Sequence, residues 1–280
     1  MPARQGPGVG WRPNVTTIVR DVVSPLAPVH TALAAMRARH GEDSLLGLVP
    51  GLVAHSPDGP AGWRSASELR TYEGARDLLD AAAERWQAQP HAAAALAWKC
   101  YTYWLALPAV LGFAAARRVP LMTPDRVLVR YADRQPFLTL ALRDPVTAVL
   151  ATDPIAATGQ PGLLVVDDEA ELLRVLRGSL VDEHLDPLLE QLRAHVHIGR
   201  RTLWGSVASG VAYGLSRAAD FLPGSTIEIA HTLLTALDAE DLIELNVNAD
   251  GSLDIQRRTC CLAFTLPTPK ICTSCCIRRA

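Results

Sequence analysis

The chain has 280 residues and a formal net charge of −2, and 49% of its residues are hydrophobic. This length allows one large domain or two modest ones with a substantial buried core. The slightly acidic balance argues against a general nucleic-acid binder, because such a protein needs a basic surface to displace counterions. No apolar segment typical of a secretion signal stands near the N-terminus, so we expect a cytoplasmic protein.

The first part of the chain is predicted to contain one interrupted helix between two irregular stretches. Residues 1–13 are rich in Gly and Pro and are expected to form a loose arm. A helical pattern covers residues 14–40, although Pro25 and Pro28 must break it or restart it. Residues 41–62 again contain many Gly and Pro residues, so we predict a loop there.

Two helical segments are predicted next. Ser65 and Glu68 have capping-box spacing and should open a segment that runs to about Gln89. The most apolar helix is expected over residues 92–117, and Cys100 within it is interpreted as a buried thiol. Its predicted core residues are Trp98, Tyr101, Trp104, Leu105 and Leu111.

The same helix contains the longest uncharged run of the chain. This run spans residues 100–116 and has seventeen residues. A helix that crosses a bilayer needs roughly 20 apolar residues. A buried helix is therefore favoured over a membrane span.

The pattern changes to strands after this helix. Residues 126–131 alternate between apolar and polar side chains, and residues 137–142 form a second hydrophobic segment after a hairpin loop. A short third strand is predicted at residues 163–166. Together these segments predict a small, mostly antiparallel sheet.

Helices return in the last part of the chain. Residues with capping character at Asp168, Asp186 and Ser225 predict three helix starts, and Pro187 follows the second of them. Residues 242–255 are predicted to form a hairpin around an Asn-Ala-Asp-Gly turn. This hairpin leads directly to the cysteines.

Five of the six cysteines lie near the C-terminus, at Cys260, Cys261, Cys272, Cys275 and Cys276. Thiolates are preferred ligands of zinc and of iron–sulfur clusters, and in the cytoplasm such groups are more often metal sites than disulfides. Adjacent side chains of an extended segment point to opposite faces, so the Cys260–Cys261 pair fits the two metal centres of a [2Fe-2S] cluster better than one zinc ion. The residues favour the cluster and leave zinc as the alternative.

The cysteine spacing resembles that of the FhuF family of ferric-siderophore reductases. It reads Cys-Cys, ten residues, Cys, two residues, Cys, and it is introduced by Arg257-Arg258-Thr259. Residues 201–209 are also similar to this family, in which the segment typically reads Leu-Trp-Gly-Asn-Val-Ala. Here Ser206 replaces the Asn, which puts any role of that Asn in doubt. The resemblance covers roughly residues 90–280.

The resemblance implies a [2Fe-2S] cluster bound through Cys260, Cys261, Cys272 and Cys275, with Cys276 as a spare thiol. It further implies one-electron reduction of siderophore-bound Fe(III), with a hydroxamate-type ferric siderophore as the substrate. No glycine-rich nucleotide loop occurs in the sequence. We therefore expect a separate electron donor, such as a ferredoxin or an NAD(P)H-dependent reductase.

Two other functions stay open. One is a zinc-stapled helical binding protein, in which the cysteines lock the C-terminal segment onto the helical body, and the other is an iron–sulfur redox sensor. An outer-sphere reductase needs neither a nucleophile nor a general base, so no catalytic residue beyond the cluster is predicted. Five cations flank the cysteines and either offset the thiolate charge or form a solvated tail. They are Arg257, Arg258, Lys270, Arg278 and Arg279.

A second polar group consists of His195, His197, Arg200 and Arg201. If one helix continues through these residues, His197 and Arg201 share a face and His195 lies off it. This group is interpreted either as a solvated or interhelical polar face or as part of a dock for the siderophore or the electron donor.

The whole chain is predicted to be an α+β protein, predominantly helical with a small antiparallel sheet and a C-terminal cysteine-ligated cluster segment. We expect an N-terminal helical region at residues 1–118, a small sheet plus helical region at residues 119–256, and a cluster-binding segment at residues 257–280. These regions are expected to form one compact unit.

Overall fold

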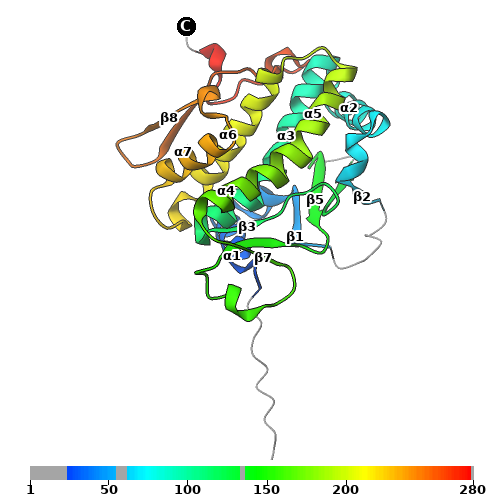
Figure 1. Ribbon diagram of the computed structural model, residues 1–280. Helices are drawn as coiled ribbons and strands as arrows, with labels where there is room; N and C mark the ends of the chain where they lie inside the picture. Colours follow the sequence, from blue (N-terminus) through cyan, green and yellow to red (C-terminus); the bar gives the residue numbers. More distant parts are fainter. Residues whose placement is uncertain (1–23, 55–61, 133–135, 279–280) are drawn as a thin grey trace, which may run out of the picture.

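The computed structural model describes residues 24–54, 62–132 and 136–278 (Figure 1). Its helices pack around the long helix α3 (Pro90–Ala116). The helices that contact α3 are α1 (Ala27–His40), α2 (Tyr72–Trp86) and α6 (Arg200–Ala218). The contact between α3 and α6 is the most extensive of these, and the two helices run side by side in Figure 1.

The composition of α3 explains its central position. Apart from His91 near its start, Lys99 is its only ionisable residue other than Cys and Tyr. Pro90 occupies the first turn, where its missing N–H costs no hydrogen bond. The indole N–H of Trp98 donates to the carbonyl of Leu203 at 2.8 Å and so fastens α3 to α6.

Four of the five predicted core residues of α3 are confirmed. Trp98, Tyr101, Leu105 and Leu111 are fully buried. Trp104 packs against the core but is only partly buried, because it also lines a cavity. Helical spacing identifies aromatic positions, but it does not show which face of the helix a neighbouring element covers.

No helix in the described part of the chain has both the length and the apolar character that a membrane crossing requires.

Two small mixed sheets lie beside the helices (Figure 1). The first has the strand order β1-β5-β4-β2, and the second has the order β3-β6-β7. The pairs β1–β5 and β6–β7 are parallel, whereas the other strand pairs of these sheets are antiparallel. The strands are β1 (Leu48–Val53), β2 (Arg64–Ser65), β3 (Arg118–Pro120), β4 (Val127–Tyr131), β5 (Leu138–Leu142), β6 (Thr147–Leu150) and β7 (Leu163–Val166).

The predicted strands appear as β4, β5 and β7, and the α+β class with predominant helix is confirmed. The prediction of a loop over residues 41–62 is wrong at β1. Pro50 and Gly51 lie inside this strand and conceal its pattern. Pro50 is tolerated because β1 is an edge strand, where one side of the backbone needs no partner.

Helices α4 (Glu169–Arg177) and α5 (Asp186–His195) are joined without a break by the π-helical segment η4 (Gly178–Leu185). Asp168 caps α4 as predicted, because its carboxylate accepts the N–H of Glu171 at 2.8 Å. The predicted cap at Asp186 is wrong, since the preceding Leu185 is already helical. The Asp186 carboxylate instead accepts a hydrogen bond from Arg200 at 2.7 Å.

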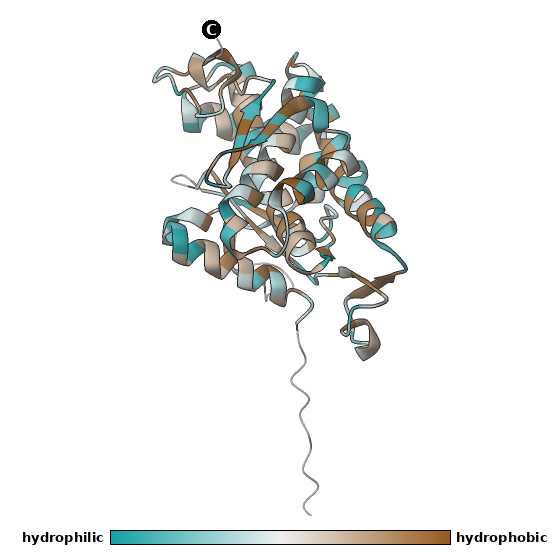
Figure 2. Ribbon diagram, turned by 90° about the vertical axis from the view of Figure 1, so that its left-hand side faces the viewer, coloured by the Kyte–Doolittle hydropathy of each residue, from teal (hydrophilic) through white to brown (hydrophobic). Residues whose placement is uncertain are grey.

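The last helix, α7 (Thr226–Ala236), begins after Ser225, whose side chain accepts the N–H of Glu228 at 3.4 Å. Strands β8 (Ile243–Val247) and β9 (Leu253–Arg257) then form the predicted antiparallel hairpin. Figure 2 shows that the outer helices alternate between hydrophobic and hydrophilic residues, as expected for elements that bury one face. The C-terminal segment follows β9 and lies at one end of the molecule, near α3 and α6 (Figure 1).

Candidate metal centre and adjoining cavity

The C-terminal segment folds back on itself after β9. The backbone N–H of Arg257 donates to the carbonyl of Ser274 at 3.1 Å. The side-chain amide of Gln256 donates to the carbonyl of Cys275 at 3.2 Å. These bonds bring the second half of the segment back to the end of β9, so the cysteines lie on a loop whose two ends are held together.

Gly205 of α6 determines how closely this segment approaches the helices. A Cβ atom at position 205 would lie 1.7 Å from Oγ1 of Thr259 and 2.7 Å from its Cβ. Only glycine fits this contact without moving the segment. Thr259 directly precedes Cys260, so the close approach also positions the first cysteine pair.

A turn at Leu262 shapes the first cysteine pair. Leu262 has a left-handed backbone with φ of 59°, which is uncommon for a residue other than Gly, Asn or Asp. Its N–H donates to Sγ of Cys260 at 3.4 Å. Hydrogen bonds to sulfur are one of the factors that set the potential of a thiolate-ligated metal centre.

The thiol groups of the two halves of the loop meet. The thiols of Cys261 and Cys272 are close enough to shift each other's pKa values. The N–H of Cys275 donates to the carbonyl of Cys272 at 3.2 Å, which closes a tight turn. Cys261 and Cys275 are buried, and every cysteine of the chain is a free thiol. Within the described residues, no three His, Cys, Asp or Glu side chains form a group that could hold a metal ion.

Neighbouring charges shift the pKa values of these thiols. Burial raises the pKa of Cys260, and it also raises the pKa of Cys272, on which Cys261 acts in the same direction. The pKa of Cys261 is lowered instead. Burial opposes this shift, but the positive charge of Lys99, a backbone N–H and the charge of Arg257 outweigh it. The loop is therefore a group of thiols with two cations acting on it.

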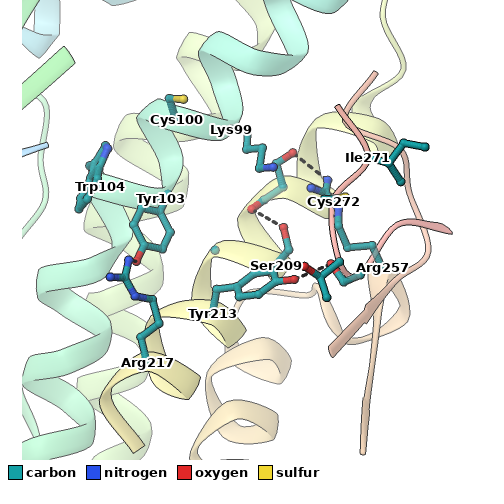
Figure 3. A pocket seen from close by; sticks show the side chains of 14 residues that line it. Lys99, Cys100, Tyr103, Trp104, Ser209, Tyr213, Arg217, Arg257, Ile271 and Cys272 are labelled. Carbon is teal, nitrogen blue, oxygen red and sulfur yellow. Dashed lines mark hydrogen bonds between the residues drawn. The ribbon is translucent and has the colours of Figure 1, made fainter. Parts of the chain in front are cut away.

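A cavity of about 490 Å³ opens beside Cys272, between α3, α6 and the C-terminal segment (Figure 3). Its volume lies in the range of small-molecule binding sites. Figure 3 shows the side chains that point into it from the two helices and from the segment. The charged and aromatic lining residues are Lys99, Tyr103, Trp104, Tyr213, Arg217 and Arg257.

The aromatic walls of the cavity are held in place. The rings of Tyr103 and Trp104 meet edge to face with centroids 4.8 Å apart, and the Tyr103 hydroxyl accepts a hydrogen bond from Arg217 at 3.3 Å. Gly47 lies directly behind Trp104, because a Cβ there would come within 2.1 Å of the indole. On the opposite wall the Tyr213 hydroxyl donates to Oγ of Ser274 at 2.7 Å.

Arg257 is the most unusual of the lining residues, because its side chain is buried. The residue is only 2% exposed, its Nη2 donates to Oγ of Ser206 at 3.1 Å, and its Nε has no hydrogen-bond partner. A buried guanidinium normally pairs with a carboxylate, because desolvation of the charge is costly. In the described part of the chain Arg257 forms no ion pair. Ser206 thus has a defined contact here, as the acceptor for a buried arginine.

The other predicted cations have different surroundings. Arg258 lies 3.9 Å from the carboxylate of Glu244, and Lys270 is exposed. The side chain of Arg278 and the whole of Arg279 lie outside the described residues. The solvated-tail interpretation therefore agrees with the exposed Lys270 and is wrong for Arg257.

Cys100 also lines the cavity and is partly buried. Burial raises the pKa of its thiol to about 11, although Lys99 acts in the opposite direction. The Cys100 thiol is therefore neutral at pH 7.

The group of His195, His197, Arg200 and Arg201 is not on one helix, so the predicted shared face is wrong. Helix α5 ends at His195, and α6 begins at Arg200, with the exposed His197 in the connection. The His195 ring stacks on Tyr72, Arg200 pairs with Asp186, and Arg201 pairs with Asp241.

Several residues that line the cavity were not predicted from the sequence as functional residues. Lys99 gave a signal, because it is the only charged residue within residues 92–116. A single charge in an otherwise apolar helix marks a position that faces a polar site or solvent. Tyr103, Tyr213 and Arg217 gave no comparable signal, since each fits the ordinary pattern of its helix.

Comparison with known proteins identifies the family. The model of the family described as "Ferric iron reductase FhuF-like transporter" matches residues 96–248. This range is more than half of the chain, and the protein belongs to this family. The matched residues include α3, from Leu96 onward, and α6, which form two walls of the cavity, and they end before the cysteines.

The chain is also similar to two solved structures of the aerobactin synthetase IucA from a hypervirulent pathotype of Klebsiella pneumoniae. The first shares 13% sequence identity over 83% of this chain and 49% of that chain, with a TM-score of 0.49. The second, with ATP bound, shares 14% over 80% and 44%, also with a TM-score of 0.49. The chain spans about half the length of these synthetases. No curated protein matches.

Proposed function

We propose that this protein is a cytoplasmic ferric-siderophore reductase that carries one [2Fe-2S] cluster on Cys260, Cys261, Cys272 and Cys275. The observation that supports this most strongly is the position of Cys272. Its thiol lies close enough to Cys261 within the cysteine loop for the two groups to shift each other's pKa values, and the same residue lines the cavity. A metal centre on this loop would therefore adjoin a space large enough for a small chelate.

The donor set fits an iron–sulfur cluster in its chemistry. Thiolates are the usual ligands, and such centres are tuned by hydrogen bonds to sulfur and by nearby charge. The N–H of Leu262 supplies a hydrogen bond to Cys260, while the positive charges of Lys99 and Arg257 act on Cys261. When bound, the cluster would supply single electrons. In this proposal residues 257–280 are the cluster-binding segment of one compact unit.

In this proposal the side chains of the protein bind the ferric chelate and position it. The cavity holds the ferric chelate beside Cys272 so that an electron crosses a short distance to Fe(III). Reduction to Fe(II) weakens the hold of hydroxamate or catecholate oxygens, and the iron is released. No bond to the chelate is made or broken by a side chain, so no nucleophile or general base is required. The electron comes from a separate donor, such as a ferredoxin or an NAD(P)H-dependent reductase.

The test is the metal content followed by single-turnover reduction. Protein purified without oxygen should be red-brown, with iron and acid-labile sulfide in equal amounts. After chemical reduction, mixing with a ferric trihydroxamate should restore the oxidised visible spectrum and yield Fe(II), trapped by a ferrous chelator.

Two results would replace the proposal with an alternative. A colourless protein with stoichiometric zinc would identify the cysteines as a structural staple. A red-brown protein that no ferric hydroxamate, catecholate or carboxylate chelate can oxidise would instead be a redox sensor.

A further inference from the structure

The charged side chains that line the cavity are all positive. Its lining contains Lys99, Arg217 and Arg257 and no Asp or Glu. Over the described ranges of the chain, none of these three cations is ion-paired with a carboxylate, whereas arginines elsewhere, such as Arg64, Arg118 and Arg200, form ion pairs. Positive charge that the protein itself leaves unpaired in a concave site attracts an anion.

Arg257 adds an observation that is independent of the charge count. The residue is 2% exposed, and its Nε has no hydrogen-bond partner. Among the described residues, its side chain forms one hydrogen bond, to Oγ of Ser206. An arginine buried in this way is stabilised when a negatively charged group accepts its remaining N–H donors.

Two of the three cations, Lys99 and Arg257, also shift the pKa values of cysteines, whereas Arg217 has a different position. The charges of Lys99 and Arg257 affect Cys261 and Cys272. Arg217 differs, because it stands on the wall formed by α6 and donates to the hydroxyl of Tyr103. Burial raises the pKa of Tyr103 and the charge of Arg217 opposes this shift, whereas Arg217 is not among the causes of the pKa shifts of Cys260, Cys261 and Cys272. Arg217 is thus free to bind a ligand.

The aromatic side chains favour a particular kind of anion. The edge-to-face pair of Tyr103 and Trp104 and the ring of Tyr213 present flat apolar surfaces between the cations. A fully hydrated inorganic ion gains little from such surfaces. A chelate of several hundred Å³ with planar chelate rings and a peripheral carboxylate can use the rings and the cations together.

We infer that the cavity selects ferric chelates of net negative charge, in particular chelates that carry a carboxylate not bound to the iron, and that Arg217 binds this carboxylate. The inference rests on the proposed function for the identity of the metal chelate. It narrows the substrate from ferric siderophores in general to the anionic members of that class.

The experiment uses one chelator with three terminal groups and a metal that is not reduced. A linear trihydroxamate is loaded with Ga(III), and its terminal amine is left free, acetylated or succinylated. The three complexes are cationic, neutral and anionic, and they share the same chelate geometry around the metal. Binding to the purified protein is measured by isothermal titration calorimetry at low salt, and again with added NaCl.

The anionic complex is expected to bind about tenfold more tightly than the cationic one, which corresponds to one or two partly screened charge contacts. Added salt should reduce this ratio. Arg217→Gln should lower the ratio to about threefold and leave the visible spectrum and iron content unchanged. Arg76→Gln, on the exposed face of α2, is the matched control and should leave the ratio at its original value. Thermal unfolding of both variants confirms that they are folded.

Equal affinity for the three gallium complexes would overturn the inference, and so would a ratio that Arg217→Gln does not change. These results are separate from the fate of the proposed function. A protein that contains zinc yet ranks the complexes by charge refutes the reductase and retains the anion-selective cavity. A protein that contains the cluster and reduces ferric chelates without ranking them retains the reductase and refutes the charge selection.

Discussion

Replacement of Gly205 by Ala tests whether the contact between α6 and the C-terminal segment positions the cysteines. The added Cβ would meet Oγ1 of Thr259 at 1.7 Å, whereas ordinary contact begins at about 3.4 Å. The obstructing atoms belong to a short, β-branched side chain next to the backbone, so rotation of a flexible end cannot relieve the clash. Thr259 and the following Cys260 must move away from the helix.

Gly210→Ala is a control on the same helix, since its nearest neighbour is Cα of Tyr103 at 3.5 Å. Both substitutions gain the same helix propensity, which therefore cancels in their comparison. Overpacking then makes Gly205→Ala less stable than Gly210→Ala by about 1–3 kcal/mol in free energy of unfolding. We expect Gly205→Ala to lose more than half of its iron and sulfide, and Gly210→Ala to retain both.

The assay combines urea unfolding, followed by circular dichroism, with iron and sulfide analysis per chain. The double variant Gly205→Ala/Thr259→Gly removes the obstructing side chain and should recover much of the metal content. If Gly205→Ala matches Gly210→Ala in both stability and metal content, the close contact does not position the cysteines and the reasoning is refuted.

Three further outcomes follow from the same contacts. Cys275→Ser should bleach the purified protein more than Cys276→Ser does, and equal loss of visible absorbance would contradict the proposed ligand set. Lys99→Met removes a positive charge that acts on Cys261. The midpoint potential in a spectroelectrochemical titration should therefore fall, on the order of 50 mV. Burial lowers the pKa of His184 from 6.5 to about 4. The unfolded chain then binds this proton more readily than the folded protein does. Lowering the pH from 7 to 5 should therefore reduce the free energy of unfolding by about 2 kcal/mol more in this protein than in a His184→Gln variant. An equal decline in the two proteins would show that His184 does not titrate in this way.

Local signals in the sequence predicted most helices and strands. Ser65, Asp168 and Ser225 each cap a helix in the structure, because a capping side chain acts on backbone groups only two or three residues away. The same local rule failed at Asp186. There the π-helical segment continues the helix across the expected boundary, and the carboxylate contacts Arg200 instead.

The spacing of the cysteines predicts candidate ligands, but no pattern in the sequence predicts the cavity. Spacing shows which thiols can share a site without showing which surface the loop faces. The burial of Arg257 depends on the return of the chain to Ser274 and on a hydroxyl from α6. Both contacts join residues that are far apart in the sequence, so no local pattern predicts them. The cavity therefore became visible only in the folded structure.

Helix α6 links the two halves of the site. Gly205 contacts Thr259 beside the first cysteine pair, Ser206 accepts the hydrogen bond of Arg257, and Tyr213 donates to Ser274 beside the last cysteines. The segment that carries the cysteines is thus seated on one face of α6, and that face also forms a wall of the cavity. The family match over residues 96–248 covers this frame and not the cysteines. A substitution at Gly205, Ser206 or Tyr213 should therefore alter metal content and chelate binding together, whereas a substitution at Arg217, one helical turn beyond Tyr213, should alter chelate binding alone.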